Sequence, residues 1–423
     1  MSYRSFEGGT KMKYGLIGKK LGHSYSKIIH EMIAPYTYEL KEIPPEELDA
    51  FMKERDFLGI NVTIPYKTDV IPYLDYIDPT AETIGAVNTV VNREGKLYGY
   101  NTDIIGITYL IKSVISDLSG KKALIAGSGG TSKTAAAALS SLGCNEYYIV
   151  GRTAKDGIIN YAEAYEKHYD ADLIINTTPL GMYPDFDSLA FDLTKFTRLS
   201  GVVDVVYNPL RTSLVLSAEK LGIPAVSGLF MLVAQAAAAS RFFIGITPDT
   251  TNEAVYNTLR ADKLNIVLTG MPGSGKSTVG KRIAKQLGRT FIDTDEEIVK
   301  TAGIPIPEIF EKYGEVYFRD LESRVIRELS TTVTGAVIAT GGGAILRDEN
   351  IKNLKFNGHI FFLDRPLCEI VPTSDRPLSS SEDMLIRRYN ERISIYLSTA
   401  DTVIKTAGTP KKTASLIIKE VKE

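Results

Sequence analysis

The sequence predicts an α/β protein in which short strands alternate with helices along the whole chain. Apolar runs such as YGLIG (14–18), ALIAGS (123–128) and NIVLTG (265–270) recur, separated by stretches with helical spacing. This alternation is typical of parallel sheets covered by helices. Glycine-rich loops follow two of these runs, and 423 residues exceed one ordinary hydrophobic core. We therefore expect two or three domains.

Composition narrows the class of protein. The chain is 44% hydrophobic and 24% charged with a net charge of -2, which argues against nucleic acid or a membrane surface as partner. No stretch reaches the ~20 apolar residues of a membrane span. Cys144 and Cys368 form no CxxC motif, which indicates a reducing cytoplasm and no disulfide framework. Polar residues 1–11 are expected to be a flexible extension.

The first glycine loop is ALIAGSGGTSKT (123–134), which reads as strand, turn and helix. Gly127 and Gly129 match the GxGxxG pattern, whereas Ser132 replaces its third glycine. Such glycines let a backbone approach a pyrophosphate that rests on the helix N-terminus. The loop therefore predicts a dinucleotide-binding Rossmann domain, with a purely structural turn as the alternative.

The strand after this loop ends in IVGRTAK (149–155) and indicates which dinucleotide binds. An NAD site favours an Asp or Glu near this point, to accept from the ribose hydroxyls. The chain instead places Arg152, Thr153 and Lys155 there, where a 2′-phosphate would lie. The sequence predicts NADP(H); a solvated basic turn is the alternative.

Polar side chains interrupt the strand-like runs upstream of this loop. Asn61, Thr63 and Lys67 lie in NVTIPYKTD (61–69), and we expect Asn88, Thr102 and Asp103 to lie at the ends of two further strands. Together these groups suit a polyhydroxylated substrate. A Lys–Asp pair can hold a ketone oxygen and move a proton during hydride transfer. Individually, each residue reads as an ordinary turn or a solvated charge.

Taken in order, these motifs resemble the shikimate dehydrogenase family over most of residues 12–260. The matching stretches are HSYS (23–26), NVTIPYK, GAVNT (85–89), NTD (101–103), INTTPLGMYP (175–184), DVVYNPLRTSLV (204–215) and GLFMLVAQAA (228–237). The family's NRT is GRT here, but its arginine and threonine are kept. The resemblance implies NADPH-dependent reduction of 3-dehydroshikimate to shikimate.

The resemblance also implies roles for individual residues. Lys67 and Asp103 would be catalytic. Substrate contacts would come from Ser24, Ser26, Asn61, Thr63, Asn88, Thr102, Tyr207 and Gln235. The NADP site would comprise Gly127, Ser128, Gly129, Gly130, Arg152, Thr153, Lys155, Thr177, Gly228 and Met231.

A second nucleotide loop, GMPGSGKST (270–278), matches the P-loop pattern GxxxxGK[ST] between a strand and a helix. Its backbone N–H groups would surround a β-phosphate, Lys276 would reach the β and γ oxygens, and Ser277 would ligate Mg²⁺. The ATP-binding residues are therefore expected to be Gly270, Gly273, Ser274, Gly275, Lys276, Ser277 and Thr278.

The stretches after the P-loop suggest the group that is phosphorylated. Asp293 and Asp295 in FIDTD (291–295) are expected on one face of a strand, one organising Mg²⁺ and the other accepting a hydroxyl proton. GEVYFRDLE (314–322) carries Arg319 and Glu322 three residues apart on a helix. The glycine turn in ATGGGAIL (339–346) would let backbone approach a substrate.

This second set resembles the shikimate kinase family over residues 263–423. The resemblance implies that Asp295 binds the substrate hydroxyl, that Arg319 and Arg392 hold the shikimate carboxylate, and that TSDRPL (373–378) is a lid. Arg376 of the lid would reach the transferred phosphate, and Gly341, Gly342 and Gly343 would contact substrate. The run CEIVPTSD (368–375) lacks the family's basic residue for stacking on adenine, so no adenine contact is assigned.

The sequence thus predicts a bifunctional cytoplasmic enzyme that converts 3-dehydroshikimate to shikimate and then to shikimate 3-phosphate, for aromatic amino acid (chorismate) biosynthesis. Its domains are expected at 12–104 (substrate), 105–240 (Rossmann), 241–262 (closing helix and linker) and 263–423 (kinase). NADP(H), ATP and Mg²⁺ are the implied cofactors. A homo-oligomer is compatible with the sequence.

Two alternatives remain at this stage. A quinate/shikimate dehydrogenase could be joined to a kinase of another small polyol. A metabolite-sensing regulator without catalysis is the second alternative, but such a protein should have lost Lys67, Asp103, Lys276 or Asp295, and all four are present.

Overall fold

The computed structural model describes residues 12–22, 24–245, 251–370, 382–406 and 408–422. The expected N-terminal extension and Arg376 lie outside these ranges. Within them, no helix has the length and apolar character that crossing a membrane requires. The chain divides into two compact units, one of residues 1–208 and 217–259 and the other of residues 209–216 and 260–423.

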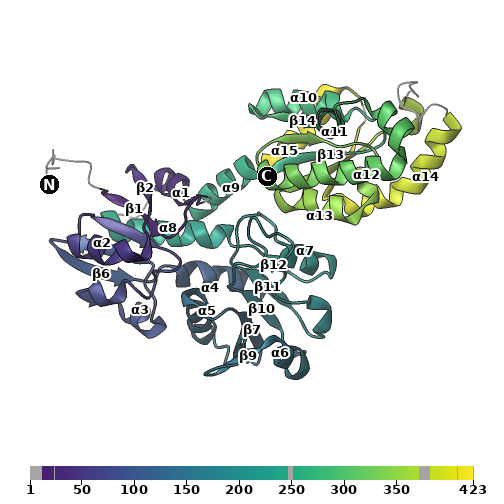
Figure 1. Ribbon diagram of the computed structural model, residues 1–423. Helices are drawn as coiled ribbons and strands as arrows, with labels where there is room; N and C mark the ends of the chain where they lie inside the picture. The colour runs from purple at the N-terminus through teal and green to yellow at the C-terminus, as the bar shows by residue number, and fades with distance from the viewer. Residues whose placement is uncertain (1–11, 23, 246–250, 371–381, 407, 423) are drawn as a thin grey trace. The chain divides into compact units, whose positions relative to one another are not determined.

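The first sheet of unit 1 is mixed and six-stranded, in the order β2-β1-β3-β5-β6-β4 (Figure 1). Its strands are β1 (Tyr14–Gly18), β2 (Tyr38–Glu42), β3 (Gly59–Val62), β4 (Tyr76–Ile77), β5 (Thr89–Arg93) and β6 (Lys96–Tyr100). Helices α1 (Ser26–Ile33), α2 (Leu48–Glu54) and α3 (Pro79–Ile84) accompany it. Apolar side chains of β1, β3, β5 and α2 form its core.

The first sheet departs from the all-parallel pattern expected from the sequence. Strand β5 runs antiparallel to both β3 and β6. The cause is a two-residue hairpin at Glu94 and Gly95, which have φ values of 55° and 84°. Positive φ at both positions matches the twist of a tight hairpin. Asn88 directly precedes Thr89, the first residue of β5, and so lies at a strand end.

The second sheet of unit 1 is wholly parallel, in the order β12-β11-β10-β7-β8-β9. Its strands are β7 (Lys122–Ala126), β8 (Glu146–Gly151), β9 (Ile158–Asn160), β10 (Leu173–Asn176), β11 (Gly201–Asp204) and β12 (Ala225–Val226). The helices are α4 (Asp103–Val114), α5 (Gly130–Ser141), α6 (Tyr161–Lys167) and α8 (Leu229–Ile244). This sheet has the expected Rossmann arrangement, with the glycine loop between β7 and α5.

Helices α4 and α8 make a close contact near the predicted site residue Asp103. A Cβ atom at Gly106 would lie 2.7 Å from the carbonyl oxygen of Met231. Only a glycine permits this approach. The first residue of α4 is Asp103, so the packing positions a predicted catalytic carboxylate.

Unit 2 contains a five-stranded parallel sheet in the order β14-β15-β13-β16-β17. Its strands are β13 (Asn265–Thr269), β14 (Phe291–Asp293), β15 (Val337–Ala339), β16 (Gly358–Asp364) and β17 (Thr402–Lys405). The helices are α10 (Lys276–Leu287), α11 (Thr294–Ala302), α12 (Ile306–Thr332), α13 (Asp348–Asn357), α14 (Glu382–Thr399) and α15 (Pro410–Lys422). Helices α7 (Ser213–Lys220) and α9 (Asn252–Lys263) each contain a boundary between the units.

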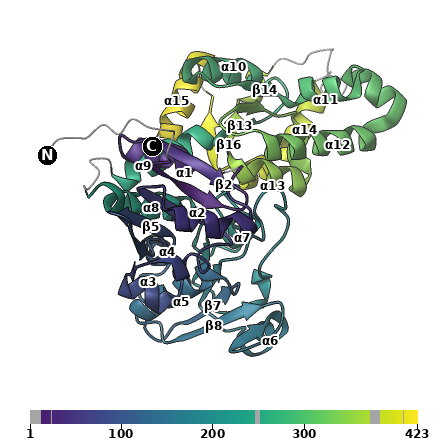
Figure 2. The ribbon, with the colours of Figure 1, turned by 60° about the vertical axis from the view of Figure 1, so that its left-hand side comes forward.

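The sheet of unit 2 is covered on both faces, which explains its continuous apolar strands. Ile266 and Leu268 of β13 pack with α10 and α15. Val267, between them in sequence, packs with residues of α12, α13 and α14. Figures 1 and 2 show α10 and α15 on one side of the sheet and α12 and α13 on the other. The predicted α/β class is confirmed for both units.

Candidate active sites

A cavity of 860 Å³ in unit 1 contains most of the residues predicted for dehydrogenation. Lys67 and Asp103 both line it, and Lys67 Nζ lies 2.6 Å from Asp103 Oδ2. Other predicted residues in the lining are Ser24, Ser26, Asn61, Thr63, Asn88, Thr177, Tyr207, Gly228, Met231 and Gln235. The fold therefore gathers residues from positions 24 to 235 around one ion pair.

Buried amides and hydroxyls form the wall behind this ion pair. The side-chain oxygen of Asn88 accepts hydrogen bonds from the backbone N–H of Thr102 at 2.7 Å and from the Thr89 hydroxyl at 3.1 Å. The Asn88 amide nitrogen donates to the Thr102 hydroxyl at 3.0 Å and to Gln235 Oε1 at 3.5 Å. Thr102 is almost fully buried and does not line the cavity, so it supports Asn88.

Asn61 is held from two sides. The hydroxyl of Tyr38 donates to its Oδ1 at 2.7 Å, and its Nδ2 donates to the Thr89 hydroxyl at 3.0 Å. These bonds fix the orientation of the amide, which is buried and would be costly to leave unsatisfied. Asn61 therefore lines the cavity and also bonds to Thr89, the first residue of β5.

Tyr207 lies at the side of the cavity where the N-terminal serines are found. Its ring centroid is 5.4 Å from that of Tyr25, and it lines the cavity with Ser24 and Ser26. Burial raises the pKa of Tyr207 to about 12, so the phenol stays protonated and able to donate a hydrogen bond at neutral pH.

The predicted dinucleotide loop borders the same cavity. Gly127 has a φ of 108°, and a Cβ atom there would lie 2.6 Å from the Thr177 hydroxyl oxygen. A Cβ atom at Gly130 would lie 3.5 Å from Lys67 Cβ, so the loop passes close to the Lys67 side chain. Thr131, which sequence reasoning missed, lines the cavity with its hydroxyl 3.5 Å from Lys67 Nζ.

The remaining predicted NADP residues lie outside the cavity lining. Arg152, Thr153 and Lys155 follow β8 and are exposed. Gly127, Ser128, Gly129 and Gly130 form the turn into α5 and also lie outside the lining. Gly228, which does line the cavity, is also required for packing, because a Cβ atom there would collide with the Val205 carbonyl oxygen.

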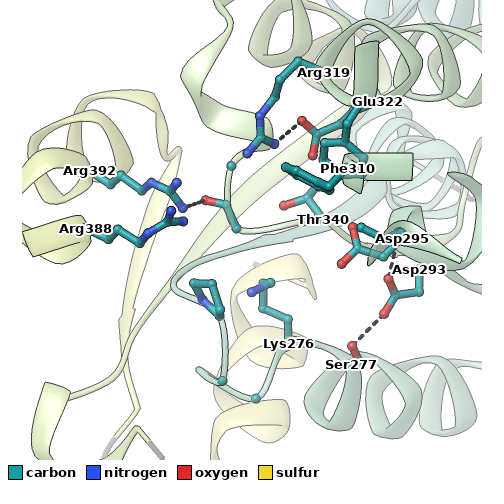
Figure 3. Close-up of a pocket in the computed structure, with 18 of the residues that line it drawn as sticks. Lys276, Ser277, Asp293, Asp295, Phe310, Arg319, Glu322, Thr340, Arg388 and Arg392 are labelled. Atoms are coloured by element: carbon teal, nitrogen blue, oxygen red, sulfur yellow. Dashed lines mark hydrogen bonds and ion pairs between the residues drawn. The ribbon is translucent and has the colours of Figure 1, made fainter. Parts of the chain in front are cut away.

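A second cavity, of 510 Å³, lies within unit 2 (Figure 3). It is lined by Gly273, Gly275, Lys276, Ser277, Thr278, Asp293, Asp295, Arg319, Gly341, Gly342, Gly343 and Arg392, all of which were predicted. Gly270 and Ser274 belong to the same loop but lie outside the lining. A Cβ atom at Gly270 would lie 2.8 Å from the Ser274 hydroxyl oxygen and 2.9 Å from the Leu363 carbonyl.

Two glycines of the predicted P-loop have positive φ values. Gly273 and Gly275 have φ values of 83° and 95°, which favour glycine. Lys276 Nζ donates to the carbonyl oxygens of Gly270 at 2.9 Å and Met271 at 3.0 Å. The Ser277 hydroxyl donates to Asp293 Oδ2 at 2.7 Å. These two oxygens are ligands of the kind that Mg²⁺ prefers, so the residues fit the ion.

Asp293 and Asp295 lie differently from the sequence prediction. Asp293 ends β14 and caps α11, accepting a hydrogen bond from the Asp295 backbone N–H at 3.1 Å. Asp295 lies in the first turn of that helix, so the expectation that both occupy one strand face is wrong. Both carboxylates nevertheless line the cavity, because the strand ends there and the helix begins.

Arginines form the opposite end of this cavity, as Figure 3 shows. Arg319 Nη1 lies 2.7 Å from Glu322, whose carboxylate is completely buried. Burial raises the pKa of Glu322, and Arg319 opposes that shift. Arg392 donates to the Gly342 carbonyl at 3.0 Å. A Cβ atom at Gly343 would lie 2.4 Å from Arg319 Nη2, so the guanidinium lies directly against the glycine turn.

Two lining arginines were not found from the sequence. Arg365 directly follows β16, with Nη1 3.5 Å from the Gly273 carbonyl and Nε 3.4 Å from Glu369. Arg388 lies on α14, four residues before Arg392, and the helical spacing that brings the two onto one face was the available signal. Ile306, Pro307, Phe310 and Phe318 supply an apolar wall.

Comparison with known proteins identifies both units. Residues 16–90 match the shikimate dehydrogenase substrate binding domain. A shikimate dehydrogenase (NADP(+)) from Halothermothrix orenii is 36% identical over 291 residues, which cover 61% of this chain and 99% of that protein. The chain belongs to the shikimate dehydrogenase family. Residues 272–422 match the shikimate kinase family. The chain is therefore a bifunctional shikimate-pathway enzyme, and the resemblance seen in the sequence is confirmed.

Solved structures give the same assignment for the first unit. Shikimate dehydrogenase 1 from Peptoclostridium difficile is 35% identical, with a TM-score of 0.55, and the match covers 58% of this chain and 97% of that one. A Thermus thermophilus shikimate 5-dehydrogenase, solved in complex with NADP(H) and shikimate, is 30% identical with a TM-score of 0.53, over 59% of this chain and 98% of that one.

Proposed function

We propose that unit 1 reduces 3-dehydroshikimate with NADPH and that unit 2 phosphorylates the hydroxyl so formed with ATP. The first step converts the ketone, NADPH and a proton into shikimate and NADP⁺. The second converts shikimate and ATP into shikimate 3-phosphate, ADP and a proton. The observation that carries the first step is the Lys67–Asp103 ion pair of 2.6 Å, enclosed in a cavity that the dinucleotide loop borders.

In the reduction, Lys67 donates a hydrogen bond to the ketone oxygen and delivers a proton as the carbon accepts hydride. Asp103 pairs with the ammonium and directs it toward that oxygen. Asn88 and Gln235, held by buried hydrogen bonds, orient the ring hydroxyls, and Ser24, Ser26 and Tyr207 bind the carboxylate end. NADPH, when bound, would supply the hydride, and Arg152 would hold its 2′-phosphate.

In the phosphorylation, Asp295 accepts the proton of the attacking hydroxyl, while Arg319 and Arg392 hold the substrate carboxylate. Lys276 and the P-loop N–H groups stabilise charge that develops on the transferred phosphate. Ser277 and Asp293 would hold Mg²⁺, which when bound neutralises phosphate charge. The apolar wall at Phe310 excludes water from the acceptor end.

An assay of the complete chain tests the proposal. With 3-dehydroshikimate, NADPH and ATP, we expect NADPH oxidation and accumulation of shikimate 3-phosphate detected by mass spectrometry. Without ATP the product should remain shikimate. Absence of NADPH oxidation would refute the first half of the proposal, and shikimate that stays unphosphorylated in the presence of ATP and Mg²⁺ would refute the second.

The same assay discriminates the alternatives. A catabolic quinate enzyme would oxidise quinate with NAD⁺ faster than it reduces 3-dehydroshikimate with NADPH. A regulator would bind shikimate without turnover. The Lys67–Asp103 pair and the P-loop lysine in its cavity favour the catalytic reading.

A further inference from the structure

Arg388 is a cation of the kinase cavity to which none of the steps above gives a role. It lies on α14 one turn before Arg392, and both side chains line the cavity. Figure 3 shows the two guanidinium groups directed into the cavity from the same helix. Arg387, the preceding residue, is exposed and lies outside the lining. Arg388 therefore reaches the cavity because it lies on the same face of α14 as Arg392.

The neighbouring arginines already have partners within the protein. Arg319 is paired with Glu322 at 2.7 Å and with Glu315 at 3.2 Å. Arg392 donates to the Gly342 carbonyl, which also accepts from the Tyr396 hydroxyl at 2.6 Å. Both guanidinium groups are thereby fixed in place, and part of their donor capacity is used.

Arg388 differs from them in having no such partner. Among the residues that the structure describes, it makes no hydrogen bond and no ion pair within 4.0 Å. Burial and the neighbouring charge of Arg392 lower its pKa. A partly buried cation next to two others is held at an electrostatic cost, which a bound anion would offset. Its planar fork of donors suits a carboxylate or a phosphate.

We propose that Arg388 is a third arginine for the carboxylate of the acceptor substrate, acting beside Arg319 and Arg392. The carboxylate is favoured over the transferred phosphate because Arg388 lines the cavity one helical turn from Arg392. Arg392 and Arg319, the two arginines assigned to the carboxylate, act on its charge, together with the opposing charges of Glu315 and Glu391. The inference rests on the proposed kinase function. It makes Arg388 a determinant of acceptor affinity and of selectivity for an anionic acceptor.

Steady-state kinase kinetics of the complete chain test this role. The Arg388→Gln variant should raise the KM for shikimate about tenfold, as expected for a lost charge-assisted hydrogen bond. The kcat and the KM for ATP should stay within about twofold of wild type. Arg388→Lys, which keeps the positive charge but lacks the planar guanidinium, should recover part of the affinity for shikimate. Arg387→Gln removes the same charge from the exposed face and should change none of these constants.

The methyl ester of shikimate tests whether Arg388 binds the carboxylate or the ring hydroxyls of the acceptor. It keeps the ring hydroxyls and lacks the negative charge, so wild type and Arg388→Gln should use it with similar KM values. An equal loss on shikimate and ester, or a fall in kcat at unchanged KM, would overturn the carboxylate assignment. So would an Arg388→Gln enzyme that behaves like Arg387→Gln. Wild-type protein that fails to phosphorylate shikimate would instead refute the proposed function itself.

Discussion

Lys67 Nζ lies 2.6 Å from Asp103 Oδ2, although the two residues belong to different elements. Lys67 is in the loop after β3, and Asp103 begins α4. Their side chains are 13% and 8% exposed, so the pair is largely shielded from water and yet lines the cavity. Removing either partner leaves a partly buried charge without its counter-ion, and removing Lys67 also takes the proton donor from the reacting centre.

The Lys67→Ala variant should therefore lose dehydrogenase turnover. We expect kcat to fall by about 10²–10⁴-fold, the usual contribution of a positioned acid–base group. The KM for 3-dehydroshikimate should change far less, because Ser24, Asn88 and Gln235 remain. Initial rates of NADPH oxidation measure both constants. Thr68→Ala, at the exposed neighbouring position, is the matched control and should retain wild-type rates.

Lys276 allows the converse experiment in unit 2. Its ammonium is buried against the P-loop carbonyls, and Lys276→Ala should lower kinase kcat by about 10²–10³-fold or more, because a charge that stabilises the transferring phosphate is lost. NADPH oxidation by the same variant should stay at the wild-type rate. Lys285→Ala, on the exposed face of α10, should affect neither reaction. If Lys276→Ala also stopped the dehydrogenase, the units would not function independently.

Much of both sites could be predicted from the sequence because their chemistry constrains the backbone locally. Gly127, Gly273 and Gly275 occupy positive φ values that other residues rarely adopt. Strand, loop and helix are contiguous there, so the pattern is visible within about a dozen residues. The carboxyl ends of parallel strands then bring such loops to one edge of each sheet.

Other features depend on contacts that a linear pattern does not contain. The antiparallel placement of β5 follows from the Glu94–Gly95 hairpin, which was not recognised as a turn. Asp295 belongs to α11 because Asp293 caps that helix, so the strand is shorter than its apolar pattern suggested. The four-residue spacing from Arg392 is the sequence signal that separates Arg388 from Arg387, but only the packing of α14 shows that this helix face meets the cavity.

Gly343 offers a steric test of the arginine end of the kinase cavity. A Cβ atom at this position would lie 2.4 Å from Arg319 Nη2, and Glu322 restrains the guanidinium from moving away. Gly343→Ala should raise the KM for shikimate about tenfold, the cost of one displaced charge-assisted contact. The KM for ATP and the dehydrogenase rate should be unchanged.

A double variant shows whether this effect passes through Arg319. If it does, Gly343→Ala should cost little more in an Arg319→Lys background, because residues that share one contact are not additive. Fully additive losses would show that Gly343 acts on the substrate by another route.

The charge of Arg152 should determine cofactor preference. It is exposed after β8, where no carboxylate precedes it to favour a free ribose hydroxyl. Arg152→Gln should reduce the ratio of kcat/KM for NADPH over NADH by about tenfold, mainly through a higher KM for NADPH. Lys112→Gln removes one positive charge from the exposed face of α4 and should leave the ratio unchanged. An unchanged ratio in Arg152→Gln would exclude it as the contact for the 2′-phosphate.

His30 makes the stability of the first sheet dependent on pH. Its ring stacks on Tyr38 with centroids 3.9 Å apart and planes 5° from parallel, and Nδ1 is 2.7 Å from the Tyr36 hydroxyl. Burial lowers the pKa of His30 from 6.5 to about 3. Folded unit 1 therefore holds the neutral ring, whereas the unfolded chain takes up a proton below pH 6.5.

The contribution of His30 to stability is complete above pH 6.5 and falls as the pH drops from 6.5 toward 3. Each pH unit costs about 1.4 kcal/mol, so lowering the pH from 6.5 to 5 should cost about 2 kcal/mol. Hydrogen exchange of peptides from β1 and β2 measures the free energy of opening at each pH. His30→Gln should be less stable at pH 7, because the stacked ring is lost, but its opening energy should vary less between pH 6.5 and 5. Equal pH slopes for the variant and wild type would mean that another group carries the acid sensitivity.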